Sequence, residues 1–157
     1  MSTHQTRYWQ DIDPGERFAT DRITISKRDI LEFAADFDPQ PYHLDNEAAT
    51  ESIFGGLCAS GWHVTALMMR LLTDTFVNRH IDLLGSSGVS QLRWSRPVYA
   101  GDTLSAQITV ADKPTTSSDP RFGYIECEVS VSNQHDKRVI DLVTSLLIGR
   151  GEGAAHG

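Results

Sequence analysis

The sequence predicts an α+β domain in which an antiparallel sheet of five or six strands wraps around one long central helix. The first observation is a helical repeat between residues 60 and 77, where one apolar stripe contains Val64, Leu67, Met68, Leu71 and Leu72. The second is a change of period after Gly85, because the later segments alternate apolar and polar residues as half-buried strands do. The third is the length of 157 residues, which fits one domain of roughly 100–200 residues. We therefore expect a single domain over residues 1–157 with its core at 16–148.

The first elements are short. Residues 1–10 are polar and are expected to be loose, and residues 18–25 predict a weak strand. Ser26, with Asp29 three residues later, is typical of a helix N-cap with an approximate capping box. Apolar residues follow Asp29 at helical spacing. We expect the first helix to begin here.

Two prolines end that helix. Pro39 and Pro41 cannot continue it, so it must stop near Asp38. A short helix is expected over residues 46–52, and the glycine-containing segment 53–59 predicts a loop. These short elements therefore connect the first strand to the long helix.

The long helix is expected to be mostly buried, because Trp62, Met69 and Phe76 widen its apolar stripe. Ser60 is its expected N-cap. Strands are predicted over residues 88–98, 104–110, 125–131 and 139–148, with a hairpin loop at 113–123. The last of these strands is apolar on both faces, which indicates an interior place in the sheet, and residues 149–157 are expected to be loose.

The composition argues against several classes of function. Lys and Arg total 14 and Asp and Glu total 21, which gives a net charge of −7. An acidic chain lacks the broad basic face that nucleic acid or an anionic membrane requires. Cys58 and Cys127 are too few for a disulfide framework or a four-ligand zinc site, and we expect both to be small core residues and no metal to be bound. Without a secretory pattern or an apolar run of about 20 residues, we expect a cytoplasmic location.

The segment Asp38-Pro39-Gln40-Pro41-Tyr42-His43 carries the chemistry, because it places an acid and an imidazole five residues apart. On a straight helix they would diverge, but two prolines fix φ and can build a stiff turn that aims both at one point. Histidine exchanges a proton readily near neutral pH and aspartate offers an acceptor, so the pair could hold and deprotonate a water. The alternative is structural: Asp38 only ends a helix and His43 is an ordinary surface or core histidine.

The residues around this pair resemble the hydratase motif of the MaoC-like family, the (R)-specific enoyl-CoA hydratases and dehydratases. That motif runs Asp-x-Asn-Pro-x-His-x-Asp, and Asp38, Pro41, His43 and Asp45 match it in register. Gln40 stands where the family usually has Asn. This departure bears on how tightly the turn holds Asp38.

Two further segments are similar to the same family. Residues 54–61 resemble its glycine-bearing approach to the central helix, although the family often has His where Ser60 stands. Residues 96–104 resemble a turn common in hotdog enzymes. The resemblance spans about residues 16–148, and together with the order of elements it implies a hotdog fold.

The resemblance also implies roles for the site residues. His43 would take or return the proton of a water, while Asp38 would orient that water and exchange a proton with the α-carbon of the substrate. Adding water to an enoyl thioester puts negative charge on the thioester oxygen, and the Gly61 N–H at the start of a buried helix would stabilise it. Because glycine lacks Cβ, a thioester could approach that amide closely. The other residues expected to bind substrate are Ser60, Gln40 and Trp62.

Several neighbouring residues have two interpretations. Arg93 and Arg96 could contact the phosphates of CoA, because guanidinium binds phosphate well, or could belong to a solvated strand face. His63 could be a second acid–base group, but we expect it on the polar side of the helix. Ser60 could be a nucleophile, but no nucleophile-elbow pattern surrounds it. No cofactor is expected.

The leading hypothesis is reversible hydration of a 2-enoyl-CoA to a 3-hydroxyacyl-CoA, with (R) stereochemistry implied by the family. A hotdog acyl-CoA thioesterase is the second hypothesis; such enzymes usually take their acid from the central helix, where Asp74 is available only late and four residues from Arg70. A non-catalytic acyl-CoA-binding subunit is the third. Because exposed sheet edges are usually covered, and because the family joins two sheets, we expect a homodimer or a dimer of dimers.

Overall fold

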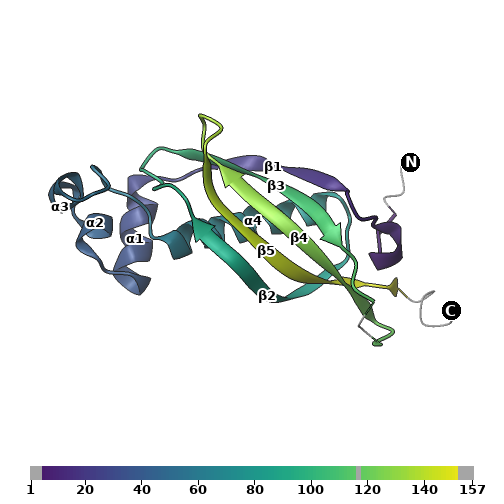
Figure 1. Cartoon of the computed structure of the whole chain (residues 1–157). Coiled ribbons are helices and arrows are strands. Elements are labelled where there is room, and N and C mark those ends of the chain that lie inside the picture. Colours follow the sequence, from purple (N-terminus) through teal and green to yellow (C-terminus); the bar gives the residue numbers. More distant parts are fainter. Residues whose placement is uncertain (1–4, 116–117, 152–157) are drawn as a thin grey trace.

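A five-stranded antiparallel sheet in the order β1-β3-β4-β5-β2 curls around one long helix, α4, in the computed structural model (Figure 1). The structure describes residues 5–115 and 118–151. The strands are β1 (Arg17–Thr24), β2 (Leu83–Trp94), β3 (Thr103–Asp112), β4 (Phe122–Ser132) and β5 (Arg138–Gly149), and α4 is Gly61–Asn78. The α+β arrangement around a central helix is confirmed.

The core lies between α4 and the concave face of the sheet. The predicted stripe on α4 is buried at Val64, Met68, Leu71 and Leu72, while Leu67 is half-buried. The inward residues of β3 and β4 alternate with outward polar ones as predicted, and those inward residues include Ile108, Val110, Ile125, Cys127 and Val129. Each fully buried large apolar side chain contributes about 1.5–3 kcal/mol relative to exposure, so this interface holds α4 in place.

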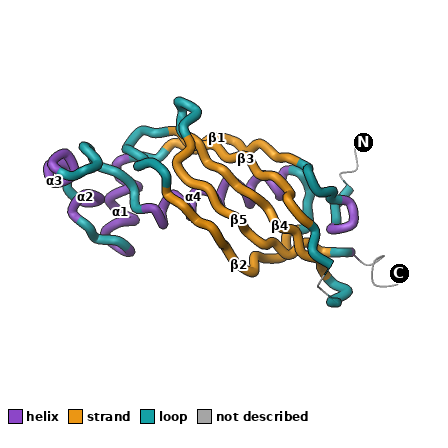
Figure 2. Tube along the Cα trace, viewed as in Figure 1, coloured by secondary structure: helices purple, strands orange, loops and turns teal. Residues whose placement is uncertain are grey.

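Three short helices lie together at one end of the sheet, beyond the first turn of α4 (Figure 2). Helix α1 (Lys27–Phe37) begins with the predicted capping box, in which the Asp29 N–H donates to Ser26 Oγ at 3.0 Å. It ends before Asp38, as the prolines require. Helix α3 (Asn46–Glu51) confirms the predicted short helix, whereas α2 (Pro41–Leu44) was not predicted.

The described parts of both termini are held in place, which differs from the expected loose ends. Trp9 lies in a 3₁₀ turn, Trp9–Asp11, and its indole Nε1 donates to the carbonyl of Tyr124 at 2.7 Å. Cations from Lys113 and Arg150 lie over this ring, at 4.1 and 4.4 Å from its centre. Residues 5–10 and 149–151 are therefore ordered by contacts with each other and with the sheet, while residues 1–4 and 152–157 lie outside the described residues.

Strand β2 departs most from the prediction. It begins at Leu83 rather than 88 and ends at Trp94 rather than 98. Its pairing with β5 shifts register three times, and Gln91 has a positive φ of 53°. Each bulge resets the alternation of side chains, so the period of two is lost in the sequence. Strand β5 pairs with β4 on one side and β2 on the other, which confirms its interior place.

Candidate active site

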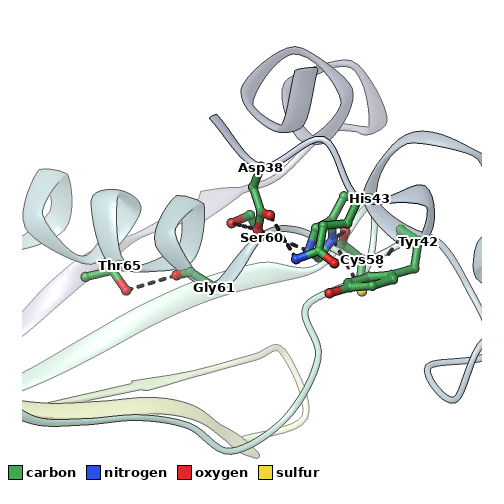
Figure 3. A network of polar contacts seen from close by, with 8 residues as sticks. Asp38, Tyr42, His43, Cys58, Ser60, Gly61 and Thr65 are labelled. Carbon is green, nitrogen blue, oxygen red and sulfur yellow. Dashed lines mark hydrogen bonds and ion pairs between the residues drawn. The ribbon is translucent and has the colours of Figure 1, made fainter. Parts of the chain in front are cut away.

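Asp38, His43 and the start of α4 meet at one end of the sheet (Figure 3). Asp38 is the C-cap of α1, His43 lies in α2, and Ser60 directly precedes α4. A cavity of about 550 Å³ opens beside them, and its buried wall includes Val64, Val98 and Val139. The proline-containing turn therefore brings the predicted acid and imidazole to one cavity.

The local fold of α2 explains why residues five apart converge. Pro41 occupies the first helical position, where its fixed φ suits a helix and its missing N–H leaves no bond unmade. The backbone N–H of His43 donates to the carbonyl of Gln40 at 2.9 Å, which closes a single turn. The chain thus reverses between Asp38 and His43, and His43 Nε2 lies 3.5 Å from Asp38 Oδ2.

The His43 ring has a defined tautomer. Its Nδ1 lies 2.6 Å from the carbonyl oxygen of Cys58. A carbonyl oxygen only accepts, so Nδ1 carries the proton and donates it. In the neutral ring Nε2 then presents its lone pair toward Asp38 and the cavity. The Cys58 carbonyl is a functional group that sequence reasoning missed, because its approach to His43 depends on the path of the loop before α4.

Two hydrogen bonds hold the Asp38 carboxylate. Ser60 Oγ donates to Oδ2 at 2.8 Å, and Gln40 Nε2 donates to Oδ1 at 3.1 Å. The Ser60 bond lowers the pKa of Asp38 most; burial opposes it, and Gln40 and the charge of His43 lower the pKa further. Gln40 therefore supplies a hydrogen bond to the motif aspartate from the position usually held by Asn. Asp38 is an ionised acceptor near neutral pH.

Ser60 is fully buried and stands at the N-cap position, but its side chain does not cap α4. Its hydroxyl turns to Asp38 instead, while its carbonyl accepts from the N–H groups of His63 and Val64. Ser60 therefore occupies the predicted N-cap position, but its side chain makes no cap hydrogen bond. Helix α4 thus begins without a cap hydrogen bond that typically contributes about 1 kcal/mol.

Gly61 is the first residue of α4, so its N–H has no partner within the helix and lies at the positive end of the helix dipole. It also lines the cavity. The structure also gives a packing reason for glycine. A Cβ at this position would lie 2.5 Å from Cε2 of Trp94, so the indole of Trp94 occupies the space where that Cβ would point.

An aromatic pair stands at the rim of the cavity. Trp62 is 59% exposed rather than part of the buried stripe. It lines the cavity and packs edge-to-face on Trp94, with ring centres 5.0 Å apart. Arg96 also lines the cavity, whereas Arg93 does not and is instead placed opposite Asp141 of β5. Only one of the two predicted arginines is therefore at the site.

The helical repeat predicted that His63 faces solvent, and this prediction was wrong. It is 8% exposed, and its ring stacks on Phe33 of α1 with centres 4.6 Å apart. Burial lowers the pKa of His63, and the charge of Asp29 opposes that shift. Its Nδ1 is buried without a hydrogen-bond partner among the residues that the structure describes. His63 is not among the residues that line the cavity.

Thiolate chemistry is unfavourable here. Cys58 and Cys127 are both buried, as predicted. Burial raises the pKa of the Cys58 thiol and raises the pKa of Cys127 to about 12.

Within residues 5–115 and 118–151 no three His, Cys, Asp or Glu side chains gather as a metal site would require, and no helix is long and apolar enough to span a bilayer.

The chain belongs to the MaoC-like family, because the model of the MaoC like domain matches residues 11–132. Its fold is the hotdog fold. The uncharacterized protein YdeM of Bacillus subtilis is 31% identical over 137 residues, which span 87% of this chain and 94% of YdeM. The crystal structure of a MaoC-like dehydratase from Rhodospirillum rubrum is 35% identical, with a TM-score of 0.79 and coverage of 92% of this chain and 97% of that one. The 3-hydroxyacyl-thioester dehydratase Z of Mycobacterium tuberculosis is 31% identical over 88 residues, 55% of this chain and 58% of that protein.

Proposed function

We propose that this protein hydrates a 2-enoyl-CoA reversibly to a 3-hydroxyacyl-CoA, with (R) stereochemistry. The observation that carries the proposal is the meeting of Asp38 Oδ2 and His43 Nε2, 3.5 Å apart, at a cavity beside the first amide of α4. Membership of the MaoC-like family and the name of the similar 3-hydroxyacyl-thioester dehydratase support the reaction class.

The pair is suited to holding a water. The Asp38 carboxylate is an acceptor, and so is His43 Nε2 when Nδ1 holds the only ring proton; 3.5 Å is too long for a direct hydrogen bond between them. A water that donates one proton to each acceptor has its lone pairs turned outward, toward the β-carbon of a bound enoyl thioester. As the C–O bond forms, His43 takes a proton from this water. This proton passes from His43 Nε2 to Asp38 Oδ2, and Asp38 then delivers it to the α-carbon, so the elements of water are added and both groups end in their starting protonation states.

The developing enolate needs a donor. Negative charge moves to the thioester oxygen as water adds, and the Gly61 N–H at the positive end of α4 is a donor without a partner inside the helix. One such donor contributes about 10²–10³-fold in rate. Three buried valines on the cavity wall, Val64, Val98 and Val139, would receive the acyl chain. This mechanism uses only side chains and backbone of the protein and needs no cofactor.

Crotonyl-CoA and a small panel of enoyl-CoAs test the reaction through loss of enoyl absorbance. We expect hydration by the wild type, and losses of about 10²–10⁴-fold for Asp38→Ala and for His43→Ala with the fold retained. A wild type that turns over no enoyl-CoA would refute the hydratase proposal. Either variant with near-full activity would refute the catalytic assignment.

The thioesterase hypothesis is weaker. The acid that it would need from the central helix, Asp74, is paired with Arg70 at 2.8 Å and does not line the cavity. Release of free thiol from acyl-CoA, measured with a thiol reagent, would support this activity over hydration. Binding of CoA esters without either reaction would support the non-catalytic subunit.

We propose that Arg96 contacts a phosphate of CoA, because it is the one arginine or lysine among the residues lining the cavity. Arg93, three residues earlier on the same chain segment and outside the lining, is the matched control. Arg96→Ala should raise the KM for crotonyl-CoA several-fold, and Arg93→Ala should not. Equal effects of the two variants would remove this assignment.

We propose that the protein is a homodimer, or a dimer of dimers, joined through the β2 edge. Strand β1 protects the opposite edge with Arg17, Asp21 and Arg22, a usual defence against edge pairing. Strand β2 instead exposes the apolar side chains of Leu84 and Val89. Sedimentation should give a dimer or tetramer, and an active monomer would contradict the proposal.

A further inference from the structure

We propose that Trp94 and Thr65 are positioning residues that hold the first turn of α4, and with it the Gly61 amide, at the cavity. The inference rests on the proposed function, because it assigns the Gly61 N–H to the thioester oxygen. The N-terminus of α4 lacks a side-chain cap hydrogen bond, and a chain of hydrogen bonds joins Trp94, Thr65 and Gly61 in the same turn.

The first turn of α4 lacks the usual support. A serine at the N-cap position normally accepts a hydrogen bond from the first turn, but the Ser60 hydroxyl donates to Asp38 Oδ2 at 2.8 Å. In this orientation the Ser60 hydroxyl makes no cap hydrogen bond to the helix. Uncapped first turns fray, and displacement of the first amide would move the donor that the reaction requires.

A second set of contacts holds the first turn of α4. The Thr65 hydroxyl donates to the carbonyl of Gly61 at 2.9 Å, as Figure 3 shows, and accepts from the indole Nε1 of Trp94 at 3.1 Å. The Trp94 ring also lies so close to Gly61 that a Cβ there would be 2.5 Å from its Cε2. Trp94 ends strand β2, so this chain fastens the first turn of α4 to the sheet.

The arrangement also explains the sequence. Glycine at 61 admits the indole, threonine at 65 is one helical turn later on the same face, and tryptophan at 94 supplies both a flat ring and an N–H donor. Trp62 packs edge-to-face on the same ring from the solvent side. Each of these residues contributes to fixing the one turn whose first residue, Gly61, lines the cavity.

The test uses nearly isosteric substitutions. Thr65→Val removes both hydrogen bonds and keeps the branched shape, and Trp94→Phe keeps an aromatic ring without the N–H donor. With crotonyl-CoA we expect Thr65→Val to lower kcat about tenfold or more with little change in KM, because the amide acts mainly on the transition state. Trp94→Phe should lower kcat less than Thr65→Val does. The double variant should match Thr65→Val, because the two substitutions break one chain.

Thr75 offers a matched control. Its hydroxyl donates to the carbonyl of Leu71 at 2.7 Å, the same i to i−4 bond on the same helix, but away from the cavity. Thr75→Val should leave kcat unchanged. Thr65→Ser, which keeps the hydroxyl, should have a kcat close to that of the wild type. Wild-type kcat in Thr65→Val, or an equal loss in Thr75→Val, would overturn the proposal.

Amide hydrogen exchange separates this proposal from the proposed function. Thr65→Val should speed exchange at the His63 and Val64 amides, which donate to the Ser60 carbonyl, and Thr75→Val should not. If the wild type hydrates no enoyl-CoA, the proposed function fails, and hydrogen exchange alone then tests whether Thr65 holds the first turn of α4. Unchanged exchange in Thr65→Val would then overturn the positioning role.

Discussion

Replacement of Ser60 by alanine isolates the hydroxyl that holds the proposed catalytic carboxylate. The substitution removes a 2.8 Å hydrogen bond to Asp38 Oδ2 and leaves the 3.1 Å bond from Gln40 to Oδ1. Hydrogen bonds to charged groups contribute about 1.5–3 kcal/mol. Because the Asp38 side chain is 22% exposed, water replaces part of the lost bond. We therefore expect Ser60→Ala to lose transition-state stabilisation near the lower limit of this range. At 1.36 kcal/mol per decade, that loss corresponds to about a tenfold decrease in kcat.

The stability of this variant should depend on pH with a definite sign. The Ser60 bond lowers the pKa of Asp38, so it favours the ionised carboxylate in the folded state. The stabilisation is present above the ordinary pKa of aspartate and is lost as the pH falls through the folded pKa. Ser60→Ala should thus be less stable than wild type at pH 7. The difference in the free energy of unfolding between the two proteins should narrow as the pH falls below 3.8, the ordinary pKa of aspartate.

Urea unfolding and crotonyl-CoA hydration measure the two effects. Ser52→Ala is the control, because Ser52 Oγ donates to the carbonyl of Ala49 at 2.6 Å and does not touch Asp38. Activity of Ser60→Ala within twofold of wild type would refute the reasoning, and so would a stability difference that is the same at pH 7 as at a pH well below 3.8, the ordinary pKa of aspartate.

Two further predictions concern the same end of the molecule. Gly61→Ala should destabilise the fold by about 1–3 kcal/mol through overpacking, because the new Cβ would meet the Trp94 ring at 2.5 Å; thermal unfolding measures this, and wild-type stability would show that the ring yields freely. His63→Phe should change how stability depends on acid: burial lowers the pKa of His63 below its ordinary 6.5, so the unfolded chain takes up the proton more readily and wild-type stability falls as the pH drops below that value. The His63→Phe variant keeps a ring stacked on Phe33 but should not lose stability in this way as the pH drops. Urea unfolding measures both proteins, and a stability difference between wild type and variant that does not change with pH would contradict the burial of a neutral ring.

Local signals in the sequence predicted most of the fold. The capping box of Ser26 and Asp29, the stripe on α4 and the alternation in β3 and β4 each depend on neighbours a few residues apart. What failed depends on distant partners. Trp9 is ordered by Tyr124, Lys113 and Arg150, and no local pattern reveals such contacts. Likewise, the bulges of β2 hide its alternation.

The candidate site was predicted in part for the same reason. The proline turn is local, so the convergence of Asp38 and His43 could be expected from the motif. His63 was placed wrongly because a helical repeat cannot say that α1 covers the second face of α4. The contact of Trp94 with Gly61 joins residues on α4 and β2, and only the folded chain reveals it. A lone tryptophan at the end of a strand gave no signal.

The central claim is that Asp38 and His43 act as one unit on one water, and a double-variant cycle tests it most directly. Initial rates of crotonyl-CoA hydration by Asp38→Ala, His43→Ala and the double variant give the three losses. We predict that the double variant is no slower than the slower single variant, within about threefold, because a unit disabled once cannot be disabled again. Losses that multiply would mean that the two residues act independently, and the shared-water mechanism would be wrong.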